Sequence, residues 1–120
     1  MGKGVLPLII LHNQEFIDRK EAKTDIEDRA YTFGDGVYEV IRIYNGKYFM
    51  LEEHLNRLQF SVNEIFISYD INQENLMENL FQLLDKNKIE DGAVYVQISR
   101  GIAPRKHPFP SNTKPELYAF

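Results

Sequence analysis

The stretch FGDGVYEVIRIYNG, residues 33–46, decides the fold of this chain. Beyond its glycine-rich start, its residues are largely β-branched or aromatic, and this composition predicts a strand over residues 37–44. Asn45-Gly46 then gives the strongest short-range signal for a two-residue hairpin, because both turn positions take positive φ. Residues 47–50 are therefore expected to pair back against this strand.

Three polar side chains interrupt the aliphatic residues of the strand: Tyr38, Glu39 and Arg42. Alternation along an extended chain places Tyr38 and Arg42 on one face and Glu39 on the other. Burying such groups is costly unless they are paired or used. For Tyr38 two interpretations stay open, a core aromatic with its hydroxyl bonded to the backbone or a residue of a binding site. Glu39 is expected to form a structural ion pair.

Two helices and four further strands complete the predicted architecture. Apolar residues at spacings of three and four predict a helix that begins near Leu51, with Glu52 and Glu53 at its positive end. A second helix is predicted from the N-cap Asn72 to about Asn87. The charged residues 18–29 are interpreted as a loop with one helical turn around 25–28, and short strands are predicted at 8–11, 16–17, 93–100 and 115–120.

The strand at 93–100 has two different faces. Side chains alternate with period two along a strand. One face is therefore aliphatic, with Val94, Val96 and Ile98. The other is aromatic and polar, with Tyr95, Gln97 and Ser99. The aliphatic face is expected to pack on the helices, and the other to turn toward a ligand or a second domain. The predicted fold class is α+β, a two-layer domain with a mainly antiparallel sheet and two helices packed on one face.

Composition limits the class of protein. With 120 residues, 43% hydrophobic and 27% charged, the chain fits one globular domain. A net charge of -4 and the lack of cysteine argue against nucleic-acid binding, disulfides and thiolate metal sites. The longest apolar stretch is too short to span a bilayer, and the Met-Gly-Lys-Gly start lacks the features of a signal peptide. The expectation is a cytoplasmic protein with no metal centre and no nucleic-acid or membrane partner.

Arg105 and His107 form the first candidate binding pair. They are two residues apart in the proline-rich stretch 103–110, which holds the chain extended, so both side chains are expected to point the same way. A guanidinium grips a carboxylate with two parallel hydrogen bonds, and an adjacent imidazole adds a third contact. The alternative, a solvated basic loop that binds nothing, stays open.

Arg57 is the second candidate. It lies one turn from His54 on the first helix and flanks the apolar stripe of that helix. Since no acidic partner is obvious, an anion such as a phosphate is the natural partner of this arginine. A salt bridge to Glu53 or Glu64 is the open alternative.

Two longer runs carry a resemblance to a known family. DRAYTFGDGVYEVIRIYNGKYFMLEEHLNRL, residues 28–58, and YVQISRGIAPRKHPFP, residues 95–110, closely resemble the N-terminal domain of the D-amino acid aminotransferases. These are pyridoxal-phosphate enzymes of fold type IV, related to the branched-chain aminotransferases and aminodeoxychorismate lyase. The first run is shared by the wider group. The second, with its Arg-Gly-x-x-Pro-Arg-x-His pattern at 100–107, resembles the carboxylate trap of the D-specific enzymes.

The resemblance assigns roles to four residues. It implies that Tyr38 contacts the substrate carboxylate, that Arg105 and His107 complete the trap, and that Arg57 binds the phosphate of pyridoxal 5'-phosphate. It also implies a homodimer, because in this family the trap pair reaches into the site of the neighbouring subunit. The small-molecule partners it implies are an amino acid and a 2-oxo acid.

The resemblance further implies that residues 1–120 are the N-terminal small domain of a longer enzyme. In the family the Schiff-base lysine comes from a larger C-terminal domain, which this chain does not include, so no catalytic residue is expected here and the chain alone is expected to be inactive. The parent is expected to transfer an amino group from a D-amino acid such as D-alanine to a 2-oxo acid. Alternatives are a branched-chain L-amino acid aminotransferase or aminodeoxychorismate lyase, and a non-catalytic small-anion-binding or interaction module.

Overall fold

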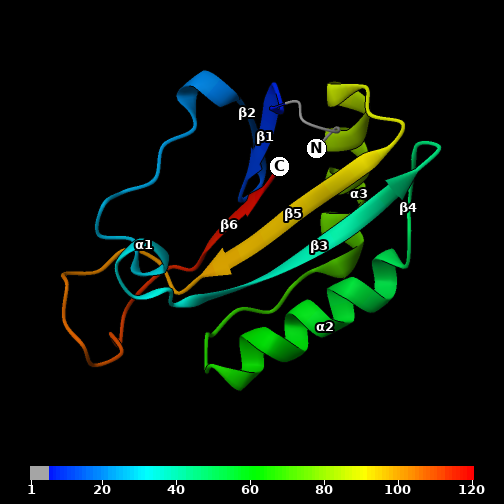
Figure 1. Ribbon diagram of the computed structural model, residues 1–120. Helices are drawn as coiled ribbons and strands as arrows, with labels where there is room; N and C mark the ends of the chain where they lie inside the picture. Colours follow the sequence, from blue (N-terminus) through cyan, green and yellow to red (C-terminus); the bar gives the residue numbers. More distant parts are fainter. Residues whose placement is uncertain (1–5) are drawn as a thin grey trace.

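The computed structural model describes residues 6–120, in which one six-stranded antiparallel sheet carries two long helices (Figure 1). The sheet has the order β2-β1-β6-β5-β3-β4. Its strands are β1 (Ile9–His12), β2 (Glu15–Asp18), β3 (Gly36–Tyr44), β4 (Lys47–Tyr48), β5 (Gly92–Ser99) and β6 (Glu116–Ala119). The Met-Gly-Lys-Gly start, for which the sequence predicts no signal peptide, lies outside the described residues.

The predicted hairpin is present, with a shorter second strand than expected. β3 runs through the predicted residues and turns at Asn45 and Gly46, both of which have positive φ. β4 covers only two residues, because Met50 takes a left-handed conformation and begins the following helix. On its other side β3 pairs with β5 over almost its whole length, from Gly36 opposite Ser99 to Ile43 opposite Gly92.

Both predicted helices are confirmed. α2 (Leu51–Glu64) carries two acidic residues in its first turn, where they complement the helix dipole. α3 (Gln73–Asn87) begins at Asn72, whose side chain accepts a hydrogen bond from the backbone N–H of Asn75. At the other end of α3 the Asn87 amide bonds the backbone of β1, accepting from Ile9 N–H and donating to Ile9 C=O at 3.0 Å each.

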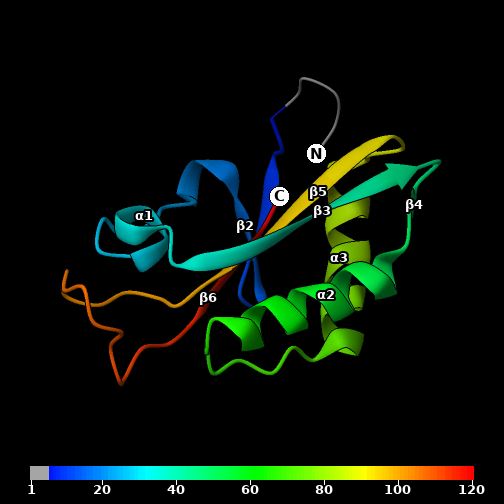
Figure 2. The same ribbon diagram turned by 60° about the horizontal axis from the view of Figure 1, so that its bottom comes forward.

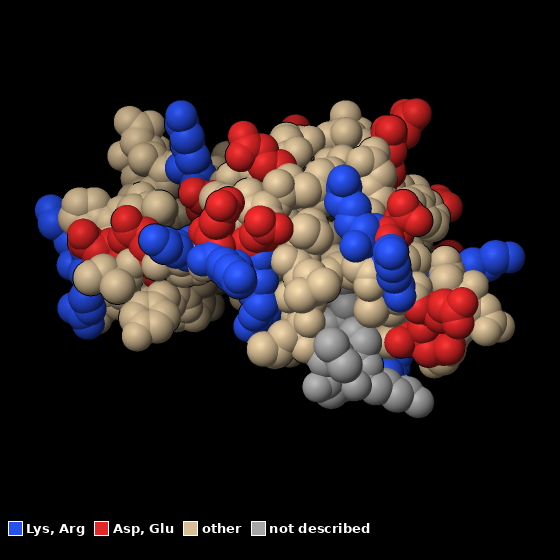
Figure 3. All heavy atoms as spheres, turned by 90° about the horizontal axis from the view of Figure 1, so that it is seen from above, with Lys and Arg blue, Asp and Glu red and all other residues tan. Residues whose placement is uncertain are grey.

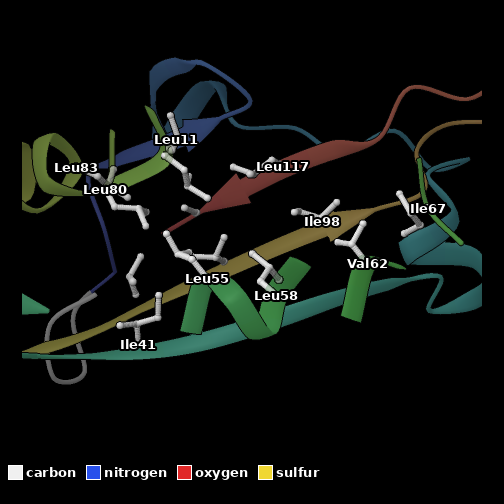
Figure 4. Packing of buried hydrophobic residues seen from close by; sticks show 14 residues of the cluster. Leu11, Ile41, Leu55, Leu58, Val62, Ile67, Leu80, Leu83, Ile98 and Leu117 are labelled. Carbon is white, nitrogen blue, oxygen red and sulfur yellow. The ribbon is translucent and has the colours of Figure 1, made fainter. Parts of the chain in front are cut away.

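The core lies between the helices and one face of the sheet. Ile41 of β3 and the aliphatic residues of β5 are fully buried, and they face the leucines of α2 and α3. Figure 2 shows both helices on the same side of the sheet, and Figure 4 shows the buried side chains pointing toward one another between the layers. The predicted two-layer α+β architecture and the predicted inward face of β5 are thus confirmed.

The segment before β3 differs from the prediction. The predicted turn exists, since the N–H of Asp28 donates to the C=O of Asp25 at 3.0 Å. However, a 3-10 helix, η1 (Arg19–Glu21), interrupts the expected loop, and a short helix that the sequence does not predict, α1 (Arg29–Phe33), begins at its last residue. Asp28 caps α1 by accepting from the N–H of Ala30. No apolar stripe announces these elements, because a single helical turn is too short to show a period.

In the described part of the chain, no helix combines the length and the apolar character needed to cross a membrane. The face shown in Figure 3 mixes basic and acidic side chains, with neither sign gathered into a separate region.

Candidate functional site

Tyr38 lies on the sheet face that the helices leave open. The residue is 60% exposed, so the interpretation as a core aromatic is wrong. The ring stacks on Tyr95 of the neighbouring strand, with centroids 5.1 Å apart and planes 17° from parallel. Phe120 also packs on Tyr95, with its ring centroid 5.2 Å away. The backbone of β3 and the stacked Tyr95 ring therefore hold the Tyr38 ring in place while leaving it accessible.

The next residue, Glu39, points to the opposite face and joins two side chains of α2. Its carboxylate accepts from Arg57 Nε at 2.8 Å and Arg57 Nη2 at 2.8 Å, and lies 2.6 Å from His54 Nδ1. The expectation of a structural pair at Glu39 is confirmed. The assumption that Arg57 has no acidic partner is wrong, and the partner is neither Glu53 nor Glu64.

The environment of Glu39 favours its charged form. Burial raises the pKa of this carboxyl, but the hydrogen bonds and charges of Arg57 and His54 outweigh burial and leave the pKa below its usual value. In return, the hydrogen bond and charge of Glu39 raise the pKa of Arg57. The pair is therefore ionised and oriented at neutral pH.

We expect the Glu39 ion pair to stabilise the fold in a pH-dependent way. Because the pKa of Glu39 is depressed in the folded state, its contribution is full above the usual value of 4.5 and is lost as pH falls through the folded value. Glu39→Gln should lower the free energy of unfolding at neutral pH, and the difference from the wild type should shrink below about pH 4.5. Urea unfolding of both proteins over a pH series measures this.

Glu78→Gln is the matched control, since Glu78 is an exposed residue of α3. This variant should follow the wild-type curve at every pH. A Glu39→Gln difference that stays constant until the protein unfolds in acid would contradict the prediction.

The outer part of Arg57 is open to an anion. Its side chain is 65% exposed even though two of its nitrogens bind Glu39. A pocket of about 260 Å³ adjoins it, lined by Met50, Glu53, His54 and Arg57. A guanidinium held in place by a carboxylate and exposed on its remaining edge is a suitable donor for a phosphate.

The structure brings Arg105 and His107 together on one aromatic ring. The Cζ atom of Arg105 lies 5.2 Å from the centre of the Phe33 ring, and the His107 ring lies 5.5 Å from it. Both side chains are exposed, as is Lys106 between them. Both candidate residues therefore adjoin the Phe33 ring, which the sequence did not single out.

The four candidate residues fall into separate groups. Among residues 6–120, no hydrogen bond or ring contact joins Tyr38 to Arg105, His107 or Arg57. Tyr38 and the loop of Arg105 nevertheless lie at the same end of the sheet, because the start of β3 pairs with the end of β5 (Figure 1). In the described residues, histidine and acidic side chains form no cluster suited to a metal ion.

Comparison with known proteins shows the family of this chain. The family described as amino-transferase class IV matches residues 36–120. The chain belongs to this family. It is 47% identical over 111 residues to a D-alanine aminotransferase of Bacillus licheniformis, a match that covers 92% of this chain and 39% of the relative. A D-alanine aminotransferase of Staphylococcus aureus (strain N315) is 46% identical over 112 residues, which cover 92% of this chain and 40% of that relative. This class IV chain therefore spans about two-fifths of the length of these relatives.

Solved structures support the fold. A branched-chain amino acid aminotransferase of Escherichia coli superposes with a TM-score of 0.88 at 22% identity, covering 95% of this chain and 39% of that one. A T.th. branched-chain amino acid aminotransferase complexed with N-(5'-phosphopyridoxyl)-L-glutamate gives a TM-score of 0.86 at 24% identity. The match covers 96% of this chain and 40% of that one. At these identities the class IV aminotransferases of known structure establish the fold type only.

Proposed function

We propose that this chain is the N-terminal domain of a pyridoxal-phosphate-dependent transaminase that moves an amino group from a D-amino acid, such as D-alanine, to a 2-oxo acid. The observation that carries the proposal is the exposed pair of Arg105 and His107 on Phe33. Relatives with 46–47% identity that bear the name D-alanine aminotransferase support the choice of substrate.

In this proposal the pair binds the substrate carboxylate. The Arg105 guanidinium forms two parallel hydrogen bonds to its two oxygens, and a His107 ring nitrogen donates a third. Tyr38 supplies a further hydroxyl from the open face of the sheet. Because the described contacts leave Tyr38 apart from the pair, we propose that the site is completed in a homodimer, with the pair of one subunit serving the Tyr38 of the other.

Arg57 is the proposed ligand of the coenzyme phosphate. Its exposed edge and the adjoining pocket fit that group, and Glu39 and His54 hold the guanidinium in place. When bound, pyridoxal phosphate would withdraw electrons from the α-carbon of the substrate so that its proton can leave. The lysine that anchors the coenzyme is proposed to lie in a further, C-terminal domain.

Two alternatives receive less support. A branched-chain L-amino acid aminotransferase and an aminodeoxychorismate lyase share the fold, but the solved structures with those names are 20–24% identical to this chain. Against a non-catalytic anion-binding or interaction module stand the relatives of 46–47% identity, which bear the name of an enzyme. The proposed setting is the cytoplasm, without a nucleic-acid or membrane partner.

The experiment is an assay of the full-length protein that contains this domain. We expect pyruvate to form from D-alanine and 2-oxoglutarate, with little transfer from L-leucine. Transfer from L-leucine without transfer from D-alanine would favour the branched-chain alternative. The 120-residue chain alone should give no turnover above free coenzyme, because the proposed lysine lies outside it. Turnover by the chain alone would contradict this division of the machinery.

A further inference from the structure

A buried charge cluster lies beside the Arg105 and His107 pair. Arg29 Nε and Arg100 Nε both donate to the same oxygen, Oδ2 of Asp35, at 2.7 Å each. The three side chains are 3%, 6% and 7% exposed for Arg29, Arg100 and Asp35. Such a cluster is costly to bury unless the remaining donors are also satisfied.

Each arginine uses its remaining donors to hold a different segment. Arg100 donates to the backbone C=O of Ile65 at 2.6 Å and of Phe66 at 3.2 Å, just beyond the end of α2. Arg29 Nη1 donates to the backbone C=O of Lys106 at 2.7 Å. Arg29 therefore binds the backbone at the one residue that lies between Arg105 and His107.

Arg29 also sets the position of the ring on which the pair rests. Its Cζ atom lies 4.5 Å from the centre of the Phe33 ring, and Arg105 contacts that same ring. The Phe109 ring covers the cluster from the other end of the loop, 4.0 Å from the Cζ atom of Arg100. Ring and backbone contacts thus join Arg29 to both candidate carboxylate-binding residues.

We propose that Arg29 is a positioning residue for the binding of the substrate carboxylate. By fixing the Lys106 backbone and the Phe33 ring, it sets the direction of Arg105 and His107. This inference rests on the proposed function of that pair. Only a planar fork reaches Asp35 with Nε and Lys106 with Nη1 at once, and a lysine has a single nitrogen for both. Asp35 in turn holds the Arg29 fork in the required orientation.

The test is Arg29→Lys in the full-length holoenzyme, with KM and kcat measured separately for D-alanine. A displaced pair weakens substrate binding, so we expect KM to rise by about ten- to a hundred-fold with kcat nearly unchanged and the coenzyme retained. Tyr48→Phe is the control, because it removes the 2.6 Å hydrogen bond to the Leu80 C=O at the opposite end of the sheet. It should leave KM at the wild-type value.

Combining Arg29→Lys with Arg105→Lys tests whether the first residue acts through the second. The double variant should lose less than the product of the two single losses, since the part of the Arg29 effect that acts through Arg105 is already lost in Arg105→Lys. Losses that multiply fully, or an Arg29→Lys protein that behaves like Tyr48→Phe, would overturn the inference. If Arg105→Lys alone leaves KM unchanged, the proposed role of the pair fails, and the inference falls with it for that separate reason.

Phe33→Leu is a second variant that decides the matter if Arg29→Lys does not fold. It keeps an apolar side chain at the end of α1 but removes the ring that Arg29, Arg105 and His107 share. KM should rise while kcat stays nearly constant. A Phe33→Leu protein with wild-type KM would overturn the inference.

Discussion

Arg105→Lys in the full-length protein is expected to lower kcat/KM for D-alanine by about ten- to a hundred-fold, the loss that a charged, bidentate contact predicts. Lysine keeps the positive charge but has no two-point fork, so the substrate carboxylate loses one hydrogen bond and its fixed orientation. The coenzyme should stay bound, because its proposed phosphate ligand, Arg57, belongs to another part of the structure. Steady-state kinetics measure the loss in kcat/KM, and the absorbance of the coenzyme shows whether it stays bound.

Two neighbouring substitutions separate a carboxylate role from general damage to the loop. Lys106→Gln should change little, because its backbone carbonyl, which accepts from Arg29, is retained. His107→Ala should fall between Lys106→Gln and Arg105→Lys, since it removes a single hydrogen-bond donor. Equal losses at Arg105 and Lys106 would remove the carboxylate assignment and the main residue-level reason for preferring D-amino acids.

Gly101→Ala is expected to lower the free energy of unfolding by about 2–6 kcal/mol, the sum of backbone strain and a steric clash. Gly101 has φ of +111°, a conformation that L-residues rarely adopt, and a Cβ atom there would meet the backbone of Lys114. The obstacle is main chain, which cannot rotate away as a side chain does. Urea unfolding followed by far-UV circular dichroism measures the loss.

Gly34→Ala is the matched control for that substitution. Gly34 also has positive φ, +63° at the end of α1, but a Cβ atom there has nothing within 4 Å. The loss should be about 1–2 kcal/mol, the usual cost of a left-handed conformation for an L-residue. Equal losses in the two variants would show that the contact with Lys114 carries no weight.

Local signals in the sequence were enough for most of the fold. The Asn45-Gly46 turn, the period-two alternation of β5 as far as Ile98 and the Asn72 cap each depend on neighbouring residues, and each is confirmed. Ser99, predicted on the open face of β5, is instead buried and donates a hydrogen bond to Asp28. The sequence does not predict the helix α1, because it is too short to show an apolar period and because the tertiary contacts of Arg29 that hold it are not visible in a short window of sequence.

The site was less predictable, because its contacts join residues far apart in the chain. Arg57 finds its partner on a strand 18 positions earlier, where helix spacing gives no hint of it. The spacing of Arg105 and His107 predicts a common direction, but their contacts with Phe33 and the bond from Arg29 to the Lys106 backbone depend on how the loop folds back over α1. The local backbone structure around a residue can be predicted from the sequence, whereas the distant residue with which its side chain pairs cannot.

The central place of β6 has a consequence for how the domain is made. β6 pairs with β1 on one side and β5 on the other, although it is the last of the six strands to be synthesised. Until residues 116–119 leave the ribosome, β1 and β5 each expose a row of unpaired backbone groups, which are templates for pairing with another nascent chain. The sheet therefore closes in a late step that joins its two halves, and long-range pairing of this kind is slow. We expect the interval before β6 emerges to be the stage of synthesis at which the edges of β1 and β5 are most open to aggregation.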